Sequence, residues 1–360
     1  FLRTIGLQQG MGNFVVMMGH GSGSQNNPHL AAYDCGACSG RHGRPNARVF
    51  AALANRPTIR SLLAERGLVI PDDTWVVGAE HNTCDEAIHW YDTDLIPETL
   101  QDKFATLQQQ LHRATRLPAH ERARRFASAP DTAHLSPEQA YRHSVARSMD
   151  FSQARPELGH ATNAFALIGR RSATRGAFFD RRVFLISYDP TQDSDGSVIE
   201  AILLAAGPVG AGINLEYYFS TVNNEGYGCG SKVTHNLNGM MGVMHGASDD
   251  LRTGLPEQMI EIHEAMRLLV VVEASTEILT TVYMRQPPLQ ELVGKGCLLL
   301  AAKDPDSEAN PLFNPAKGWT RRDGEPHQLA QVKRSADWYT GQREPLPMSL
   351  IEQPEVRHAP

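Results

Sequence analysis

The sequence feature that most constrains the fold is a pair of short apolar runs separated by helical periodicity. The runs are Asn13 to Gly19 and Thr74 to Ala79, and each has the β-branched composition typical of a buried strand. Between them, apolar residues at helical spacing predict one helix from about Asn46 and a second from Pro57 to Gly67. Strand, helices and strand make a βαβ unit, which predicts an α/β fold with a mostly parallel sheet.

Each of these predicted strands is followed by a histidine, His20 after the first and His81 after the second. In an open parallel sheet, the ligand site lies beyond the carboxyl ends of the strands. We therefore expect both histidines at one edge of the sheet, and we expect that edge to carry the functional site.

The rest of the chain predicts a helical segment and a second α/β lobe. Glu98 to Ala127 has the spacing of an amphipathic helix, or of a helical hairpin broken at Pro118, and its arginine-rich part from His120 is typical of a solvated helix face. In the second lobe we predict strands at Arg182 to Asp189, Arg267 to Ala274 and Cys297 to Asp304, and helices at Ser197 to Ala206 and Ser275 to Met284. The predicted domains are a βαβ region over 1–95, a helical spacer over 96–150, a second α/β lobe over 151–310 and a surface tail over 311–360.

Composition and charge argue against several classes of protein. The net charge of −6 provides no basic excess for binding nucleic acid. No run of consecutive apolar residues approaches the roughly 18 that a membrane span needs, so we expect a peripheral protein if it works at a membrane. Five cysteines without a signal peptide predict reduced thiols in a cytosolic setting. Because the sequence opens without methionine, we expect it to be part of a longer or processed polypeptide.

The stretch GHGSGSQNNPHLAAYDCGAC, from Gly19 to Cys38, allows several kinds of site. A phosphate cradle would need a Gly-Lys-Ser/Thr or a complete G-x-G-x-x-G motif, and a zinc ribbon would need a second Cys-x-x-Cys pair. Cys35 and Cys38 have redox spacing, yet a long polar loop precedes them where such a motif usually follows a strand. His20 and Cys35 are ligand types that zinc prefers, but zinc needs three or four ligands. The residues alone therefore leave a metal site, a redox motif and a plain turn open.

A second metal site is an alternative elsewhere in the chain. Cys229, His235 and His245 follow a Gly- and Asn-rich stretch that faintly repeats the first one. Turns rich in these residues resemble one another by composition, which weakens the comparison.

Longer motifs give a more specific indication. GHGSGSQNNPHLAAYDCGACSGRHGRPNARVFAALAN, IPDDTW, HNTCDE, INLEYYFSTV and GYGCGSKVTHNLNGMMGV, with others as far as about Asp304, resemble the DabA family. Members of that family are the large zinc-containing subunits of a bacterial inorganic-carbon accumulation complex. The resemblance implies a sheet like that of β-carbonic anhydrase, with Zn²⁺ as cofactor and His20 and Cys35 as two of its ligands.

The resemblance also implies what lies outside this sequence. The other two zinc ligands of the family come from an upstream Cys-x-Asp-x-Arg motif, which this chain lacks, so the upstream half of the same protein is expected to supply them. Cys84 stands where the family more often has threonine. The implied activity is vectorial hydration of CO2 to bicarbonate, coupled to a membrane-embedded antiporter-like partner, with this subunit peripheral on the cytoplasmic face. A zinc-dependent hydrolase and a non-catalytic scaffold with structural zinc are the alternatives, so enzymatic activity stays an open question at this point.

Overall fold

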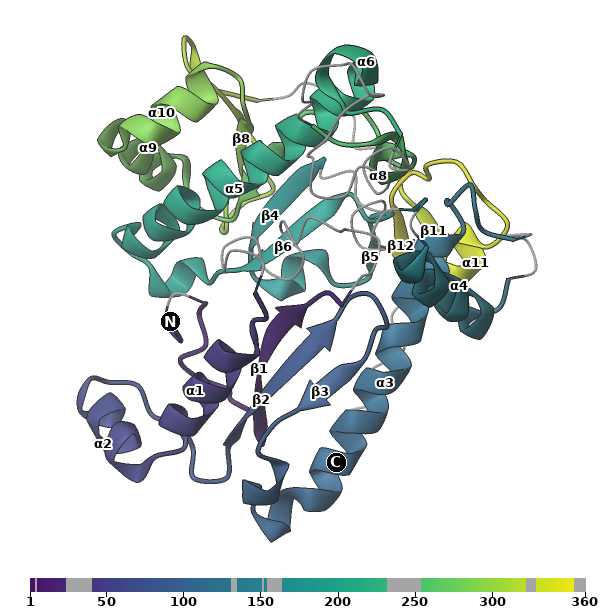
Figure 1. The fold of residues 1–360 in the computed structure, drawn as a ribbon. Coiled ribbons are helices and arrows are strands. Elements are labelled where there is room, and N and C mark those ends of the chain that lie inside the picture. Colours follow the sequence, from purple (N-terminus) through teal and green to yellow (C-terminus); the bar gives the residue numbers. More distant parts are fainter. Residues whose placement is uncertain are drawn as a thin grey trace. The chain divides into compact units, whose positions relative to one another are not determined.

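The structure is a computed structural model, and it describes residues 1–3, 5–23, 41–130, 135–150, 152–153, 164–231, 254–321 and 328–352. The chain divides into two compact units, each built from segments that are distant in sequence. The histidine unit comprises Leu7–His160 and Cys229–Glu261, and the large-sheet unit comprises Phe1–Gly6, Ala161–Gly228 and Ile262–Pro360. Both contain helices and strands, which confirms the predicted α/β class (Figure 1).

The histidine unit is built around a three-stranded sheet in the order β1-β2-β3. β1 (Phe14–Gly21) and β2 (Trp75–Asn82) are parallel, as the βαβ pattern predicts, whereas the short β3 (Ile88–Trp90) is antiparallel to β2. The helices of this unit are α1 (Arg44–Ala54), α2 (Pro57–Glu65), α3 (Gln101–Ala123), α4 (Pro137–Met149) and α8 (Glu257–Ile260), with 3-10 turns at Thr93–Leu95 and Glu98–Leu100.

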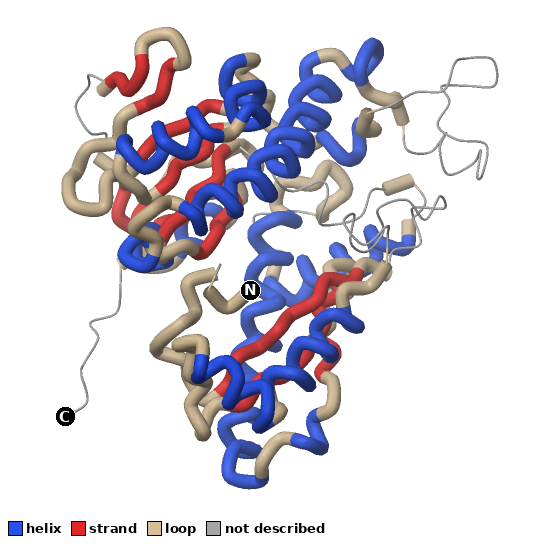
Figure 2. Tube along the Cα trace, turned by 90° about the vertical axis from the view of Figure 1, so that its left-hand side faces the viewer, coloured by secondary structure: helices blue, strands red, loops and turns tan. Residues whose placement is uncertain are grey.

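Helices cover both faces of this sheet (Figure 2). α1 packs so closely on one face that a Cβ added to Gly78 of β2 would lie 3.1 Å from the carbonyl oxygen of Ala47. On the opposite face, Phe104 of α3 joins Val77 of β2 in an apolar cluster, with the ring of Trp90 edge-on to Phe104 at 5.0 Å. The alternation of side chains along β2 therefore assigns residues 76, 78 and 80 to the α1 face and 77, 79 and 81 to the α3 face.

α3 is one continuous helix, so the predicted alternative of a hairpin broken at Pro118 is wrong. An interior proline removes one backbone hydrogen bond and crowds the preceding turn. The helix continues because the residues after the proline are buried, including Ala119 and Ala123, which are fully inaccessible to solvent. Tertiary packing of this last turn offsets the local cost of the proline.

The large-sheet unit holds a six-stranded sheet in the order β10-β9-β8-β7-β4-β6. The four strands β8, β7, β4 and β6 are parallel, and β9 and β10 run antiparallel at one side, so the sheet is mixed. Its strands are β4 (Phe165–Gly169), β6 (Val183–Ser187), β7 (Leu269–Val272), β8 (Leu299–Ala302), β9 (Leu312–Asn314) and β10 (Gly318–Thr320). The strands predicted within residues 182–189, 267–274 and 297–304 are thus confirmed. The segment after Pro311, expected to be a surface tail, contributes two strands to this sheet.

A smaller sheet in the order β11-β12-β5 completes the strands of this unit. It consists of β5 (Ala177–Phe178), β11 (Ala330–Val332) and β12 (Ser349–Ile351). The helices of the unit are α5 (Ser197–Val222), α6 (Asn224–Tyr227), α9 (Thr276–Arg285), α10 (Pro287–Gly294) and α11 (Ser335–Tyr339), with 3-10 turns at Arg171–Thr174 and Pro190–Gln192.

α5 differs most from the sequence prediction, which ended this helix at Ala206. It extends over 26 residues, passes through Pro208, and is long and apolar enough to cross a membrane by length and composition. The expectation that nothing in the chain approaches a membrane span is therefore wrong for the described part of the chain. One third of the most apolar window of α5 is buried, and Ile199, Leu203 and Ala211 belong to the core beside the six-stranded sheet. Core helices of large domains have the same composition.

Candidate functional site

The two histidines predicted at the strand ends lie opposite each other in the parallel ladder. β1 and β2 pair in register from Phe14 with Trp75 to Gly21 with Asn82, and this register places His20 beside His81. Both follow the alternation that directs side chains to the α3 face of the sheet. The prediction that both histidines lie at one edge of one sheet is confirmed.

The main chain of His20 is held by a close approach of glycines. The backbone N–H of Gly43, just before α1, donates to the carbonyl of His20 at 2.8 Å. A Cβ on Gly19 would lie 2.7 Å from the carbonyl carbon of Gly43, and a Cβ on Gly43 would lie 2.8 Å from the nitrogen of His20. Only glycine fits both positions without a backbone shift, so these two residues fix where α1 begins relative to His20.

The His20 imidazole contacts the loop that follows β2. Its Nε2 lies 3.3 Å from Oγ1 of Thr83, and the Thr83 hydroxyl donates in turn to the carbonyl of Gly21 at 3.3 Å. A hydroxyl has one proton, so with that proton on the Gly21 carbonyl it accepts from Nε2–H of His20. This arrangement leaves Nδ1 of a neutral imidazole with its lone pair, which is the form of histidine that binds metal ions.

His81 belongs to a buried charged network. Its Nε2 lies 2.7 Å from Oε2 of Glu86, and the other carboxylate oxygen of Glu86 accepts from the guanidinium of Arg122 on α3. Glu86 and Arg122 are both buried. Burial alone would raise the pKa of Glu86, but the hydrogen bond to His81 and the charge of Arg122 outweigh it and hold that pKa below its ordinary value. Glu86 is therefore an ionised carboxylate inside the protein.

The opposite face of β2 carries a second pair of an acid and a histidine. Nδ1 of His42 lies 3.3 Å from Oε1 of the buried Glu80. Gly21 makes room for this carboxylate, since a Cβ at Gly21 would lie 2.9 Å from its carbon. Glu80 and His42 line a cavity of ≈ 580 Å³ together with Arg44, Asn82, Ile88, His89, Trp90, Tyr91, Thr93 and Gln108.

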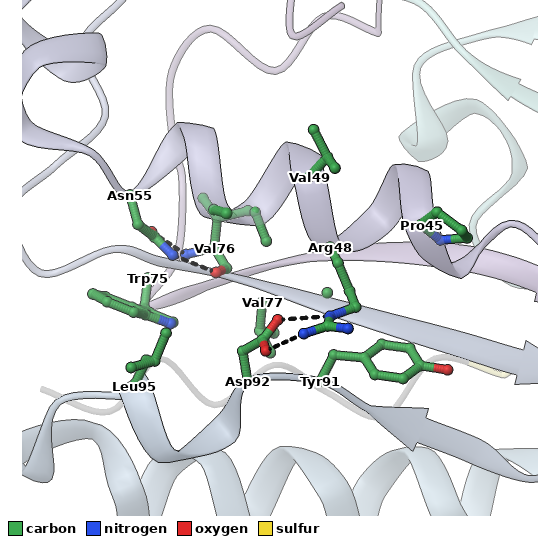
Figure 3. A pocket seen from close by; sticks show the side chains of 13 residues that line it. Pro45, Arg48, Val49, Asn55, Trp75, Val76, Val77, Tyr91, Asp92 and Leu95 are labelled. Atoms are coloured by element: carbon green, nitrogen blue, oxygen red, sulfur yellow. Dashed lines mark hydrogen bonds and ion pairs between the residues drawn. The ribbon is translucent and has the colours of Figure 1, made fainter.

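A further cavity of ≈ 490 Å³ lies between α1 and the first half of β2 (Figure 3). Its lining is largely apolar, and the one charged pair beside it is internally satisfied, because Arg48 binds both carboxylate oxygens of Asp92 at 2.9 and 2.6 Å. The side-chain amide of Asn55 accepts from the Val76 N–H at 3.0 Å and donates to the Val76 carbonyl at 2.7 Å, as a neighbouring strand would. This cavity therefore offers apolar surface without a free charged group.

The remaining predicted site residues have different outcomes. Cys35 and Cys38 lie outside the described residues, as do His235 and His245 of the alternative second metal site. Cys229 is buried, and so is Cys84, whose Sγ lies 3.2 Å from Oγ of Ser22. Within the described ranges, no three His, Cys, Asp or Glu side chains lie close enough to hold a metal ion. His20 is thus the one described residue of the predicted pair, and its imidazole has the chemistry of a ligand.

Sequence reasoning missed the acidic and basic partners at this edge. Arg122 and Arg124 were expected on a solvated helix face, but both are buried, and that expectation is wrong. His120 belongs to the same segment and was also expected to face solvent, but its Nε2 lies 2.7 Å from the carbonyl oxygen of Leu135. The available signal was the acidic exit of β2 in HNTCDE, where Glu86 follows His81 by five residues.

Together, the fold and the site define an α/β protein with paired histidines at the carboxyl edge of a parallel strand pair. The chain matches the family model described as "Probable inorganic carbon transporter subunit DabA" over residues 1–298. It belongs to the DabA family.

Curated relatives extend this match over nearly the whole chain. The "Probable inorganic carbon transporter subunit DabA" of Methylococcus capsulatus is 63% identical over 98% of this chain and 32% of its own length. The protein of the same description from Dechloromonas aromatica is 61% identical over 98% of this chain and 34% of its own length. The one from Nitrosococcus oceani is 53% identical over 100% of this chain and 33% of its own length. The chain thus spans about a third of the length of these relatives. No solved structure matches it.

Proposed function

We propose that this chain is part of an inorganic-carbon transporter subunit in which a zinc-dependent, carbonic-anhydrase-like site hydrates CO2 to bicarbonate. The observation that carries the proposal is the position of His20, which lies at the carboxyl end of a parallel strand and whose Nδ1 has no hydrogen-bond partner among the described residues. The family match and the description of the relatives as inorganic carbon transporter subunits support the substrate.

His20 and Cys35 would hold the zinc ion, together with ligands from the part of the longer protein that this chain does not contain. When bound, zinc lowers the pKa of a coordinated water toward ~7 and so makes hydroxide available near neutral pH. The contribution of the described residues is orientation. Thr83 fixes the imidazole of His20, and the contact between Gly19 and Gly43 fixes its backbone.

Transport in one direction requires coupling to an energy source. We place that source in a membrane-embedded antiporter-like partner, with this subunit peripheral on the cytoplasmic face. The support from the structure is confined to one side of α5, where Ile199 and Leu203 are buried in the core beside the six-stranded sheet.

The test uses the complete subunit with three substitutions: His20→Ala, Cys35→Ala and Cys38→Ala. Loss of a zinc ligand should empty the site, whereas loss of a neighbouring group typically lowers metal affinity only ~10- to 100-fold. We expect His20→Ala and Cys35→Ala to abolish both stoichiometric zinc, measured by elemental analysis, and accumulation of labelled inorganic carbon. Cys38→Ala is the matched control and should retain both.

Four results would count against the proposal. Full zinc occupancy in His20→Ala, or loss of zinc in Cys38→Ala alone, would mean that the ligands are wrongly chosen. Zinc-dependent ester hydrolysis without CO2 hydration would indicate a hydrolase instead. Normal accumulation of inorganic carbon by a zinc-free variant would indicate that the metal is structural.

A further inference from the structure

The imidazole of His81 is held at one nitrogen only. Its Nε2 is 2.7 Å from Oε2 of Glu86, and its side chain is 31% exposed. Among the described residues, Nδ1 of His81 has no hydrogen-bond partner. The ring is thus anchored on its buried side and open on the other, at the edge where His20 lies in register.

Glu86 determines which nitrogen carries the hydrogen. Its carboxylate is buried between Arg122 and His81, with side-chain exposure of 2%, and it adopts a left-handed backbone with φ of 56°. A carboxylate paired with a buried guanidinium has no proton to donate, so the hydrogen of this contact lies on Nε2 of His81. In the neutral ring, Nδ1 then carries the lone pair and can only accept a hydrogen bond.

Each member of this network is itself fixed. Arg122 belongs to the last turn of α3, and its side chain is 4% exposed. Glu86 is five residues from His81, in the turn between β2 and β3. The carboxylate is therefore supported from two elements, and the orientation of the ring does not depend on solvent. Such support of a functional histidine by a carboxylate is a recurrent arrangement in proteins.

We propose that Nδ1 of His81 accepts a hydrogen bond from an O–H ligand at this strand edge, either a water molecule or the hydroxyl of bicarbonate, and that Glu86 is the residue that positions it. The identity of the ligand depends on the proposed function. The identity of the acceptor atom depends only on the geometry of Glu86, Arg122 and His81.

The first test needs no transport activity. The full chain is labelled with ¹⁵N-histidine, the His81 signals are identified by their loss in His81→Gln, and spectra are recorded over a series of rising pH until the signals of the neutral ring are reached. We expect the Nε2–H form with Nδ1 as the unprotonated nitrogen. A dominant Nδ1–H form would overturn the proposal. A shift of the Nδ1 signal on adding bicarbonate, absent in His81→Gln, would assign the ligand as bicarbonate.

The second test separates the acceptor from the contact with Glu86. In His81→Asn, the amide oxygen can take the place of Nδ1, whereas in His81→Gln the amide can replace only Nε2 and its contact with Glu86. We expect zinc content to be normal in both variants of the complete subunit. Uptake of labelled inorganic carbon should fall at least about tenfold further in His81→Gln than in His81→Asn.

The outcomes distinguish the acceptor role from a structural one. The reverse order, equal losses, or unchanged uptake in both variants would overturn the proposal, because each would mean that Nδ1 is not the atom that matters. If the unsubstituted subunit accumulates no inorganic carbon, the proposed function fails, while the ¹⁵N measurement still decides the tautomer of His81 independently.

Discussion

Replacing Asn55 should destabilise the histidine unit by a predictable amount. The Asn55 side chain makes two hydrogen bonds to the backbone of Val76, at 3.0 and 2.7 Å (Figure 3). Val76 is paired with β1 on one side and lies outside the residues 79–81 that pair with β3 on the other. Each such bond contributes a net ~0.5–1.5 kcal/mol. The adjacent cavity admits water that can partly replace the lost groups, so Asn55→Ala should lower the free energy of unfolding by about 1–3 kcal/mol.

Asn55→Asp refines this prediction. It keeps an acceptor for the Val76 N–H but presents a second oxygen to the Val76 carbonyl in place of the donor. At neutral pH we expect the contact between the two oxygens to lower the stability, an effect that the charge of Arg60 partly offsets, since Nη2 of Arg60 donates to Oδ1 of Asn55 at 3.2 Å. Ser61→Ala is the matched control, because the Ser61 hydroxyl makes only an exposed bond within its own helix. That variant should stay within about 0.5 kcal/mol of the unsubstituted protein.

The assay is urea unfolding monitored by tryptophan fluorescence. Trp319 and Trp338 are first replaced by phenylalanine, so that the signal reports only Trp75 and Trp90 of the histidine unit. With a slope of ~1–3 kcal/mol per molar urea, the midpoint should fall by about 1 M in Asn55→Ala. A change below about 0.5 kcal/mol in Asn55→Ala, or full stability of Asn55→Asp at neutral pH, would refute the role assigned to this side chain.

Three further predictions concern stability. Gly19→Ala should cost about 1–3 kcal/mol, because its Cβ would lie 2.7 Å from the Gly43 carbonyl carbon, whereas Gly12→Ala has no atom within 4 Å and should be neutral; urea midpoints compare the two. The lowered folded-state pKa of Glu86 means that its stabilisation is present above its unfolded pKa of ~4.3 and is lost as pH falls through the folded value. Unfolding curves from pH 7 to 3 should therefore show a weaker acid dependence in Glu86→Gln. Ile199→Ala, at a fully buried position of α5, should cost about 2–5 kcal/mol by thermal unfolding, and Val209→Ala at 62% exposure less than about 0.5 kcal/mol; equal effects would contradict α5 as a core helix.

The parallel pairing of β1 and β2 was predictable because its determinants are local. Each strand is a β-branched apolar run, and the helices between them force a crossover that favours parallel strands. β3 was not predicted, since three residues carry too little pattern and this strand exists through its pairing with residues 79–81. The length of α5 was missed for the opposite reason. Pro208 predicts a break locally, and only packing against the sheet shows that the helix continues.

At the site, the positions of the two histidines could be predicted from the sequence, but their hydrogen-bond partners could not. His20 and His81 follow strand ends, so alternation and parallel pairing place them together. Glu86 and Arg122 are separated by 36 residues, and their pairing depends on how α3 lies on the sheet. No periodicity encodes that distance. A charged residue in an arginine-rich helix is usually solvated, and only the tertiary structure reveals the exception.

The close approach of Gly19 and Gly43 has a consequence for binding energetics. His20 lies within the paired strands β1 and β2, and its carbonyl oxygen accepts a hydrogen bond from the N–H of Gly43, so its backbone is immobilised when the unit folds. Fixing one backbone residue costs about 1–2 kcal/mol, and at His20 this entropy is lost during folding and not on capture of a ligand. Any ligand of His20 therefore meets a preorganised atom, and variation in affinity among relatives of this chain should originate in the ordering of the other groups that contact the ligand.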